Sequence, residues 1–170
     1  MGTLTSLPRE AVKGCGGIDY VMIANYGDVS TGIYTSSPSE GLAWINPASA
    51  ANWTKFVPRK ESSNFTETAT GVPATGVSSY NQVLTLVFAY NQTVKRNQLK
   101  IMGQSELVAV AVDRNSNAWL LGSRNGLDLT SGTLVSGTAN GDMNGMTIIL
   151  SGNESEPMAS VDAVLLASIK

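Results

Sequence analysis

E-L-V-A-V-A-V-D-R-N-S-N-A-W-L-L, which runs from Glu106 to Leu121, is the stretch that decides the fold of this chain. In an extended strand, successive side chains point to opposite faces. One face of this strand would carry Leu107, Ala109 and Ala111, and the other Val108, Val110 and Val112. A strand that is apolar on both faces has to be covered on both sides, so it belongs in the middle of a sheet.

The second half of the stretch reverses the chain. Five turn formers, Asp113 to Asn117, follow the apolar run, and Ala118 to Leu121 then leads back beside it. We therefore predict a central hairpin in one β-rich domain that spans residues 1–170.

Composition indicates a protein that associates with other chains. A chain of 170 residues can bury roughly two thirds of the surface that its unfolded form exposes, so it needs neither a metal nor a disulfide for stability. Only 14% of its residues are charged, so hydroxyls and amides keep the surface polar and protect it poorly against association. The alternative is a β domain that stays soluble on its own.

Charge and cysteine content narrow the partners and the compartment. A net charge of −2 argues against wrapping a nucleic acid tightly, because that requires a basic patch. Cys15 is the sole cysteine, so no intrachain disulfide can form. The first eight residues lack a secretory pattern, and no apolar run approaches membrane-spanning length. We expect folding in a reducing cytoplasm and no membrane partner.

Alternating segments predict further strands around the central hairpin. Short strands are expected at residues 18–24, 42–45, 53–57 and 146–150, and a last strand at 161–169. The segments 29–39 and 153–157 are expected to be a loop and a polar turn.

A long hairpin is expected from residues 59–70 and 78–90. Its first arm places Ser62, Asn64, Thr66, Thr68 and Thr70 on one uniformly small, polar face. Its second arm places Leu84, Leu86, Phe88 and Tyr90 on one apolar face. Arms of roughly ten residues are about twice the mean strand length, which suits strand pairing between subunits.

One helix is predicted over Asn91 to Met102, where the apolar residues change to helical spacing. Asn91 is the candidate N-cap and Gly103 the candidate C-cap. We favour a solvated face, over a binding patch, for Arg96 and Lys100.

The glycine-rich segment from Gly122 to Gly145 has two compatible interpretations. One is a short strand at residues 127–129 between turns, and the other is a projecting loop that touches a neighbouring subunit.

Catalytic and metal-binding motifs are weak. The chain has no histidine, so it cannot by itself build a Ser-His-Asp or Cys-His nucleophile or a histidine-ligated metal site. Asp113, Asn115 and Asn117 copy half of a calcium loop, but Arg124 occupies the position of the bidentate glutamate. We expect no enzyme activity, no cofactor and no metal.

Two further sets of residues have a functional and a structural interpretation. Glu154 and Glu156 could form a glycosidase-like carboxylate pair, but a solvated turn is favoured. Trp44, Trp53 and Trp119 could form a sugar-binding platform on a small β-sandwich, but core packing is favoured.

Three segments resemble small virion proteins of tailed phages. They are GCGGIDYVMIANYGDV (Gly14 to Val29), VAVDRNSNAWLLGSRNGLDLTSG (Val110 to Gly132) and TANGDMNGMTIILSGNESEP (Thr138 to Pro157). The order of the expected elements also resembles that of phage tail tube proteins. The resemblance implies a mainly β fold, a β-sandwich or barrel with one flanking α-helix, a long hairpin and extended loops.

The resemblance also implies a function and partners. Tail tube proteins form stacked six-subunit rings whose long strands join into one barrel around the DNA channel. The expected partners are further copies of the chain, other virion tail proteins and DNA in transient, non-specific passage. The expected location is the virion, after synthesis in the cytoplasm of the host bacterium. A capsid decoration protein or another virion protein is the alternative.

Candidate residues follow from these expectations. The candidate inter-subunit strands or lumen lining are Glu61, Ser62, Asn64, Thr66, Glu67, Thr68, Thr70, Leu84, Leu86 and Phe88. The candidate ring-stacking loop contains Gly126, Asp128, Gly132, Gly137, Gly141 and Asp142, with residues 29–40 as a second candidate. A DNA channel should be neutral or acidic, because basic and aromatic side chains would grip the passing strand.

Overall fold

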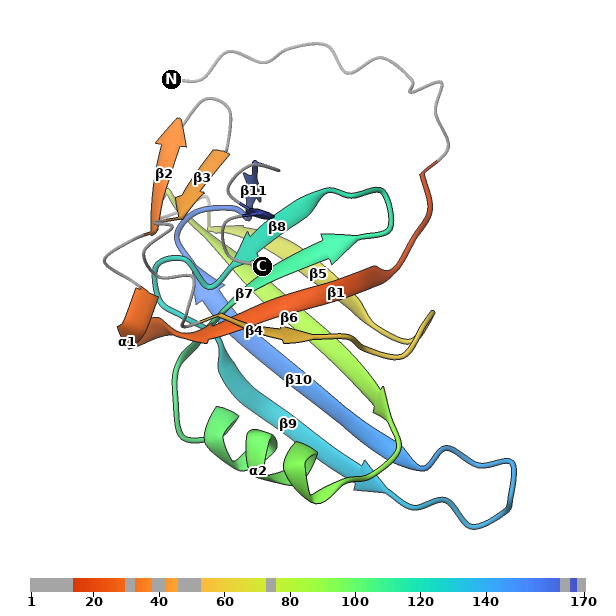
Figure 1. Cartoon of the computed structure of the whole chain (residues 1–170). Helices are drawn as coiled ribbons and strands as arrows, with labels where there is room; N and C mark the ends of the chain where they lie inside the picture. Colours follow the sequence, from red (N-terminus) through yellow and green to blue (C-terminus); the bar gives the residue numbers. More distant parts are fainter. Residues whose placement is uncertain are drawn as a thin grey trace.

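A computed structural model describes residues 14–29, 33–37, 42–45, 53–72, 76–162 and 166–167 of the chain (Figure 1). The described chain is mainly β, and two sheets pack face to face as a β-sandwich. This confirms the predicted mainly β class.

The larger sheet has seven strands in the order β2-β3-β11-β8-β7-β1-β4. Their bounds are β1 Ile18–Asn25, β2 Ile33–Ser37, β3 Leu42–Ile45, β4 Thr54–Phe56, β7 Leu107–Asp113, β8 Ala118–Leu121 and β11 Ala159–Val161. All neighbours are antiparallel except β3 and β11, which run parallel.

The smaller sheet has four antiparallel strands in the order β5-β6-β10-β9. Their bounds are β5 Asn64–Val72, β6 Val77–Ala89, β9 Asp128–Val135 and β10 Gly145–Glu154. The helices are α1 Tyr26–Val29 and α2 Thr93–Met102. Figure 1 shows α2 beside β9 at one end of this sheet, on the side that faces the larger sheet.

Strand β7 is buried on both faces, as predicted. Its two neighbours are β1 and β8, and the β7–β8 pair is the expected hairpin. Leu107, Ala109 and Ala111 contribute to the core between the sheets, and Val108, Val110 and Val112 to a second core with Trp53 and Leu166. Each fully buried valine or leucine side chain contributes about 1.5–3 kcal/mol.

Asp113 holds the turn of this hairpin. Its Oδ1 accepts the backbone N–H of Asn115 and of Asn117, each at 2.8 Å. Partial burial raises the pKa of Asp113, but the hydrogen bonds from Asn117 and Asn115 outweigh it and hold the pKa below its ordinary value. The Asn115 amide also exchanges two 2.8 Å hydrogen bonds with the backbone of Cys15, so the turn fixes the start of β1.

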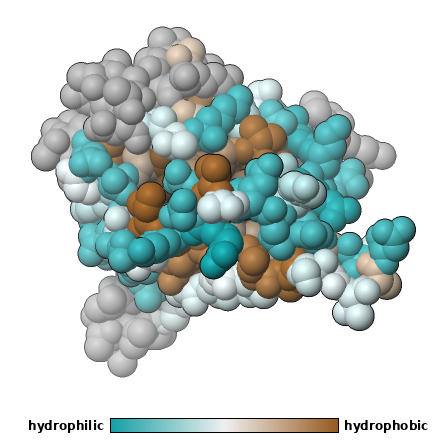
Figure 2. Space-filling model, turned by 60° about the horizontal axis from the view of Figure 1, so that its bottom comes forward, coloured by the Kyte–Doolittle hydropathy of each residue, from teal (hydrophilic) through white to brown (hydrophobic). Residues whose placement is uncertain are grey.

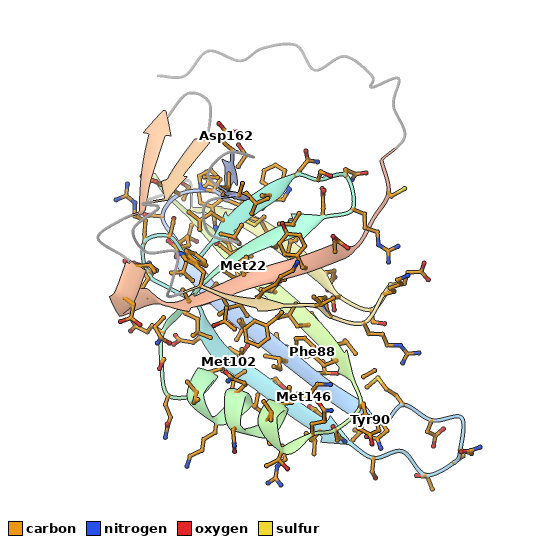
Figure 3. All side chains as sticks on the ribbon, viewed as in Figure 1. Met22, Phe88, Tyr90, Met102, Met146 and Asp162 are labelled. Atoms are coloured by element: carbon orange, nitrogen blue, oxygen red, sulfur yellow. The ribbon has the colours of Figure 1, made fainter. Side chains whose placement is uncertain are left out.

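Helix α2 differs from the prediction at its start and along its apolar face. Its N-cap is Gln92, without a side-chain cap, and the predicted N-cap Asn91 donates from Nδ2 to the Val135 carbonyl at 2.7 Å. Gly103 is the C-cap, as predicted. Figure 3 shows Met102 beside Phe88 and Met146, in the core between α2 and the smaller sheet. Val94 and Ile101, by contrast, are exposed.

Strand β9 is longer than predicted. The expected strand at residues 127–129 extends from Asp128 to Val135. A bulge separates Leu129, which pairs with Leu150, from Ser131, which pairs with Ile149. Because a bulge inserts one extra residue, here Thr130, the alternation of inward and outward residues is shifted and the sequence no longer shows it.

Four further boundaries differ from the prediction. Residues 33–37 of the expected loop form strand β2, and β10 continues through Glu154 into the expected turn. Tyr90, expected on the apolar face of the hairpin, is exposed with a φ of 68°. The last strand, β11, is Ala159–Val161 and overlaps the expected strand at residues 161–169 at Val161, and among the described residues beyond it Leu166 N–H donates to the Asp162 carbonyl in a helical turn. Apolar runs this short suit either a strand or a helix.

A substitution at Gly145 tests the register in which β10 pairs with β6. A Cβ on Gly145 would lie 2.4 Å from the backbone oxygen of Phe88, whereas one on Gly141 would meet nothing within 4 Å. We expect Gly145→Ala to lower the free energy of unfolding in urea by about 1–3 kcal/mol. Gly141→Ala should leave it unchanged or raise it by up to about 1 kcal/mol. Equal stabilities of the two variants would contradict this register.

Candidate assembly surface

The smaller sheet presents one face to the rest of the molecule and one to the outside. Its inner face carries Leu84, Leu86, Met146, Ile148 and Leu150, all buried in the core. Strand register places the opposite side chains on an outer face. The outer face carries Asn64, Thr66, Thr68 and Thr70 from β5, Asn81, Val83 and Thr85 from β6, Thr147, Ile149 and Ser151 from β10, and Asp128, Ser131 and Thr133 from β9.

The outer face is polar and almost free of charge. Asp128 is the single charged residue among those that the register places on it, and no lysine or arginine is among them. Hydroxyl and amide side chains dominate, with Val83 and Ile149 half-buried between them. Such a face offers neither the basic groups nor the aromatic rings that hold a nucleic acid.

Both edges of the smaller sheet are long and open. Strand β5 has nine residues and β9 has eight, and no strand in the described ranges pairs with the outer edge of either. The larger sheet ends instead in the short strands β2 and β4, of five and three residues. Short edges resist further pairing, whereas a long open edge is a template for another chain.

The predicted lumen residues fall into three groups. Asn64, Thr66, Thr68 and Thr70 lie together on the outer face of β5. Leu84, Leu86 and Phe88 are buried in this chain's own core. The remaining three lie away from the outer face: Glu61 pairs with Arg114, Ser62 bonds the Lys60 carbonyl, and Glu67 accepts from Gln82 and from the Met158 N–H.

The predicted ring-stacking residues also lie in different parts of the structure, and only some of them are in a projecting loop. Gly126 is a buried turn residue with a φ of 79°, and Asp128 and Gly132 belong to β9. Gly132 leaves room for Leu99 of α2, because a Cβ there would lie 2.8 Å from Leu99 Cδ1. Gly137, Gly141 and Asp142 lie in the loop 136–144, which projects beyond the sheet in Figure 1. Of the second candidate, 30–32 and 38–40 lie outside the described residues.

Asp142 organises that projecting loop. Its Oδ2 accepts the backbone N–H of Thr138 and of Ala139 at 2.8 and 2.7 Å. The hydrogen bonds from Ala139 and Thr138 hold the pKa of Asp142 below its ordinary value. The loop is therefore stabilised by hydrogen bonds within itself.

The prediction of a solvated carboxylate pair at Glu154 and Glu156 is wrong for Glu154. It is 1% exposed and accepts the backbone N–H groups of Arg124 and Asn125 at 3.0–3.3 Å. Burial raises the pKa of its carboxyl, although these hydrogen bonds oppose the shift. Glu156 instead forms an exposed ion pair with Arg124 at 3.2 Å. The two carboxylates thus hold one loop by different means. Nothing in the sequence of β10 indicated that Glu154 would be buried.

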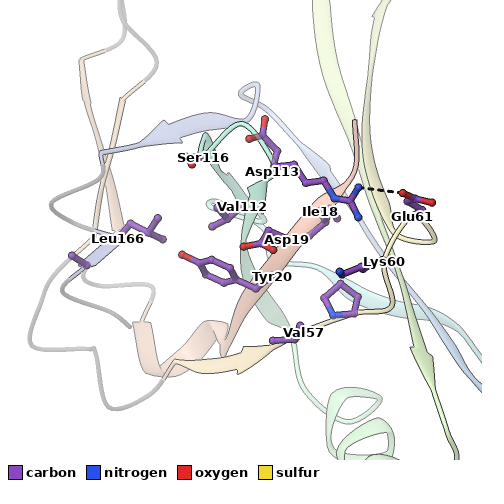
Figure 4. A pocket seen from close by; sticks show the side chains of 13 residues that line it. Ile18, Asp19, Tyr20, Val57, Lys60, Glu61, Val112, Asp113, Ser116 and Leu166 are labelled. Carbon is purple, nitrogen blue, oxygen red and sulfur yellow. Dashed lines mark ion pairs between the residues drawn. The ribbon is translucent and has the colours of Figure 1, made fainter. Parts of the chain in front are cut away.

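Among the described residues, Trp53, Trp119 and one hollow offer no assembled ligand site, and the side chain of Trp44 lies outside what the structure describes. Trp53 is buried in the second core, and Trp119 packs against Phe65 with ring centroids 6.5 Å apart. A hollow of about 780 Å³ lies beside β1 and the β7–β8 turn, lined by Asp19, Lys60, Glu61, Asp113 and Arg114 among others (Figure 4). Glu61 and Arg114 pair with each other there, and Asp113 is occupied by its turn.

Comparisons with known proteins found no family model, curated protein or solved structure that matches the chain. In the described ranges, no helix has both the length and the apolar character needed to cross a bilayer.

Glu154→Gln tests the buried carboxylate. We expect it to lower the free energy of unfolding by about 1–3 kcal/mol, because one acceptor of backbone N–H groups is lost. A raised pKa stabilises the fold fully below the unfolded pKa, and this contribution is lost as pH rises through the folded pKa. The advantage of the wild type over Glu154→Gln should therefore shrink as the pH rises from about 4, near the ordinary pKa of a glutamate.

Glu156→Gln is the matched control for this comparison. Its carboxylate is half-exposed, so we expect a change below about 1 kcal/mol. Urea titrations of the two variants across this pH range check both statements, and a similar loss in both would contradict the structural role of Glu154.

Proposed function

We propose that this chain is a structural protein that assembles with copies of itself through the two open edges of the smaller sheet, and that the assembly is the tail tube of a tailed-phage virion. The observation that carries the proposal is a sheet with two long edges that no described strand pairs with, and between them a polar outer face on which Asp128 is the single charged residue. The resemblance of three sequence segments to tailed-phage virion proteins supports the virion role.

Strand direction suits a closed ring. Four antiparallel strands alternate in direction, so β5 and β9 at the two edges run in opposite directions. A rotation that brings β9 of one copy beside β5 of the next therefore makes another antiparallel pair. Repeated around a ring, this heterologous contact closes on itself and leaves no free edge in the barrel. By the resemblance, the ring has six copies.

The outer face suits a channel for DNA. In such a barrel α2 and the larger sheet lie on the far side of the smaller sheet from this face. The face would then line the lumen with Thr, Ser and Asn side chains and with Asp128. Phosphates passing such a wall meet no cation to hold them, so DNA can slide. The projecting loop 136–144 is in place to contact the next ring or another tail protein.

The first test is assembly of the purified chain. We expect rings or tubes by negative-stain electron microscopy and a large species in sedimentation velocity. Thr68 lies on the outer face in the middle of β5. Thr68→Lys should abolish these species, because it places a lysine at every junction between copies, and lysine on an edge opposes pairing.

Ser155→Lys is the control, since Ser155 is also exposed but follows the end of β10. It should assemble as the wild type does, and circular dichroism should show both variants folded. A wild-type chain that stays monomeric at high concentration, or a Thr68→Lys variant that still forms tubes, would end the proposal.

A further inference from the structure

Asparagine is followed directly by glycine at three places in the chain. An asparagine in this position can lose its side-chain amide, because glycine has no Cβ to keep its backbone nitrogen away from the asparagine side chain. The three pairs have the same local sequence, so the sequence alone does not rank them. The structure gives them very different surroundings. They are Asn125-Gly126, Asn140-Gly141 and Asn144-Gly145.

The loss of the amide needs only the chain itself and water. The glycine nitrogen attacks the asparagine Cγ, so that an N–Cγ bond forms as the Cγ–Nδ2 bond breaks. The proton of the glycine N–H leaves with the amide nitrogen as ammonia, and a succinimide ring remains. Water then opens the ring: its OH bonds to a ring carbonyl carbon and its proton goes to the ring nitrogen. The product is aspartate or isoaspartate, and nothing is oxidised or reduced. A pair reacts, therefore, only where the glycine N–H is not held and the backbone can turn.

The first pair is held on both sides of the reacting bond. Asn125 Nδ2 donates to the Asn153 carbonyl at 2.7 Å, and Asn125 N donates to the Glu154 carboxylate at 3.0 Å. The Gly126 N–H is a further donor to that carboxylate, and Gly126 is buried with a φ of 79°. The nitrogen that would attack is therefore already bound, and the side chain that it would attack is bound as well.

The third pair is held by the smaller sheet. Gly145 is buried as the first residue of β10, and it lies between its partners Ala89 on β6 and Val135 on β9. Asn144 Oδ1 accepts the Asn91 N–H at 3.3 Å. Bringing the Gly145 nitrogen onto the Asn144 side chain would therefore break strand pairing at this end of the sheet.

The middle pair lies in the projecting loop 136–144, and both of its residues are exposed. Asp142 N–H donates to the Ala139 carbonyl at 3.0 Å, so Asn140 and Gly141 are the two central residues of a β-turn. Asp142 Oδ2 holds the N–H groups of Thr138 and Ala139, which precede the pair. Among the described residues, none forms a hydrogen bond with the Asn140 side chain or with the Gly141 N–H.

This turn also has the space that the ring needs. A Cβ on Gly141 would meet nothing within 4 Å. In Figure 2 the loop is the projection at the right of the molecule, where mainly hydrophilic and neutral residues stand clear of the body. Water therefore reaches the pair, and an exposed loop of this kind opens locally at a small cost in free energy.

We propose that Asn140 is a site of spontaneous covalent modification, where the side-chain amide is lost to give aspartate or isoaspartate, and that the fold protects Asn125 and Asn144. The reaction adds a negative charge to a chain whose net charge is −2. Isoaspartate also carries the backbone through its side chain, which lengthens the loop. Both changes fall beside Asp142, so they alter the surface that the projecting loop presents and leave the sandwich core intact. The proposal does not depend on the proposed assembly.

The experiment compares the folded full chain with the same chain unfolded in guanidinium chloride, both kept in mildly alkaline buffer. Tandem mass spectrometry of chymotryptic peptides locates each modified residue, because Leu127, Leu134 and Met143 separate the three sites. In the folded chain, we expect Asn140 to react about tenfold or more faster than the other two asparagines, which react only when the fold opens. In the unfolded chain, the three rates should become similar, because the bonds that protect two of the pairs are gone.

Gly141→Ala is the matched variant. Its added methyl group meets nothing in the fold but hinders attack by its own nitrogen, so reaction at Asn140 should slow by roughly tenfold. Circular dichroism should show this variant folded. The assembly variant Thr68→Lys is incubated in parallel. Reaction at Asn140 in that variant and not in the wild type would also support the proposal, because it would show that assembly covers the loop.

Three outcomes would overturn the proposal. The first is a folded chain in which Asn125 or Asn144 reacts as fast as Asn140. The second is an Asn140 that stays intact in both the folded wild type and Thr68→Lys but reacts in the unfolded chain. The third is a Gly141→Ala variant that reacts at the wild-type rate.

Discussion

Burial of strand β7 from both sides is the constraint on which the described structure depends. The valines on one face and Leu107, Ala109 and Ala111 on the other belong to two separate cores. The smaller sheet and α2 complete one core, and Trp53 and Leu166 contribute to the other. Because β7 has apolar side chains on both faces, neither side can be left to water, and the molecule becomes layered around it.

Buried polar groups fasten the layers to each other. Gln82 on β6 accepts the Gly122 N–H after β8 and donates to Glu67 on β5, which also accepts the Met158 N–H. Glu154 on β10 receives the N–H groups of the same loop two residues further on. All of these bonds except the one between Gln82 and Glu67 satisfy a backbone N–H group, and so the link between β8 and β9 has a fixed path.

Local pattern alone determined the hairpin at Glu106 to Leu121, the long arms that became β5 and β6, and the polar row from Asn64 to Thr70. In each case, the side chains repeat with the period of the backbone, so the residues themselves state which face is buried. Only the tertiary structure decided the length of β9, the burial of Glu154 and the exposure of Val94 and Ile101. A bulge shifts the first pattern, backbone donors distant in sequence compensate the second, and the third depends on α2 covering the sheet with just one flank. These outcomes arise from contacts between segments far apart in the chain, and no local repeat encodes them.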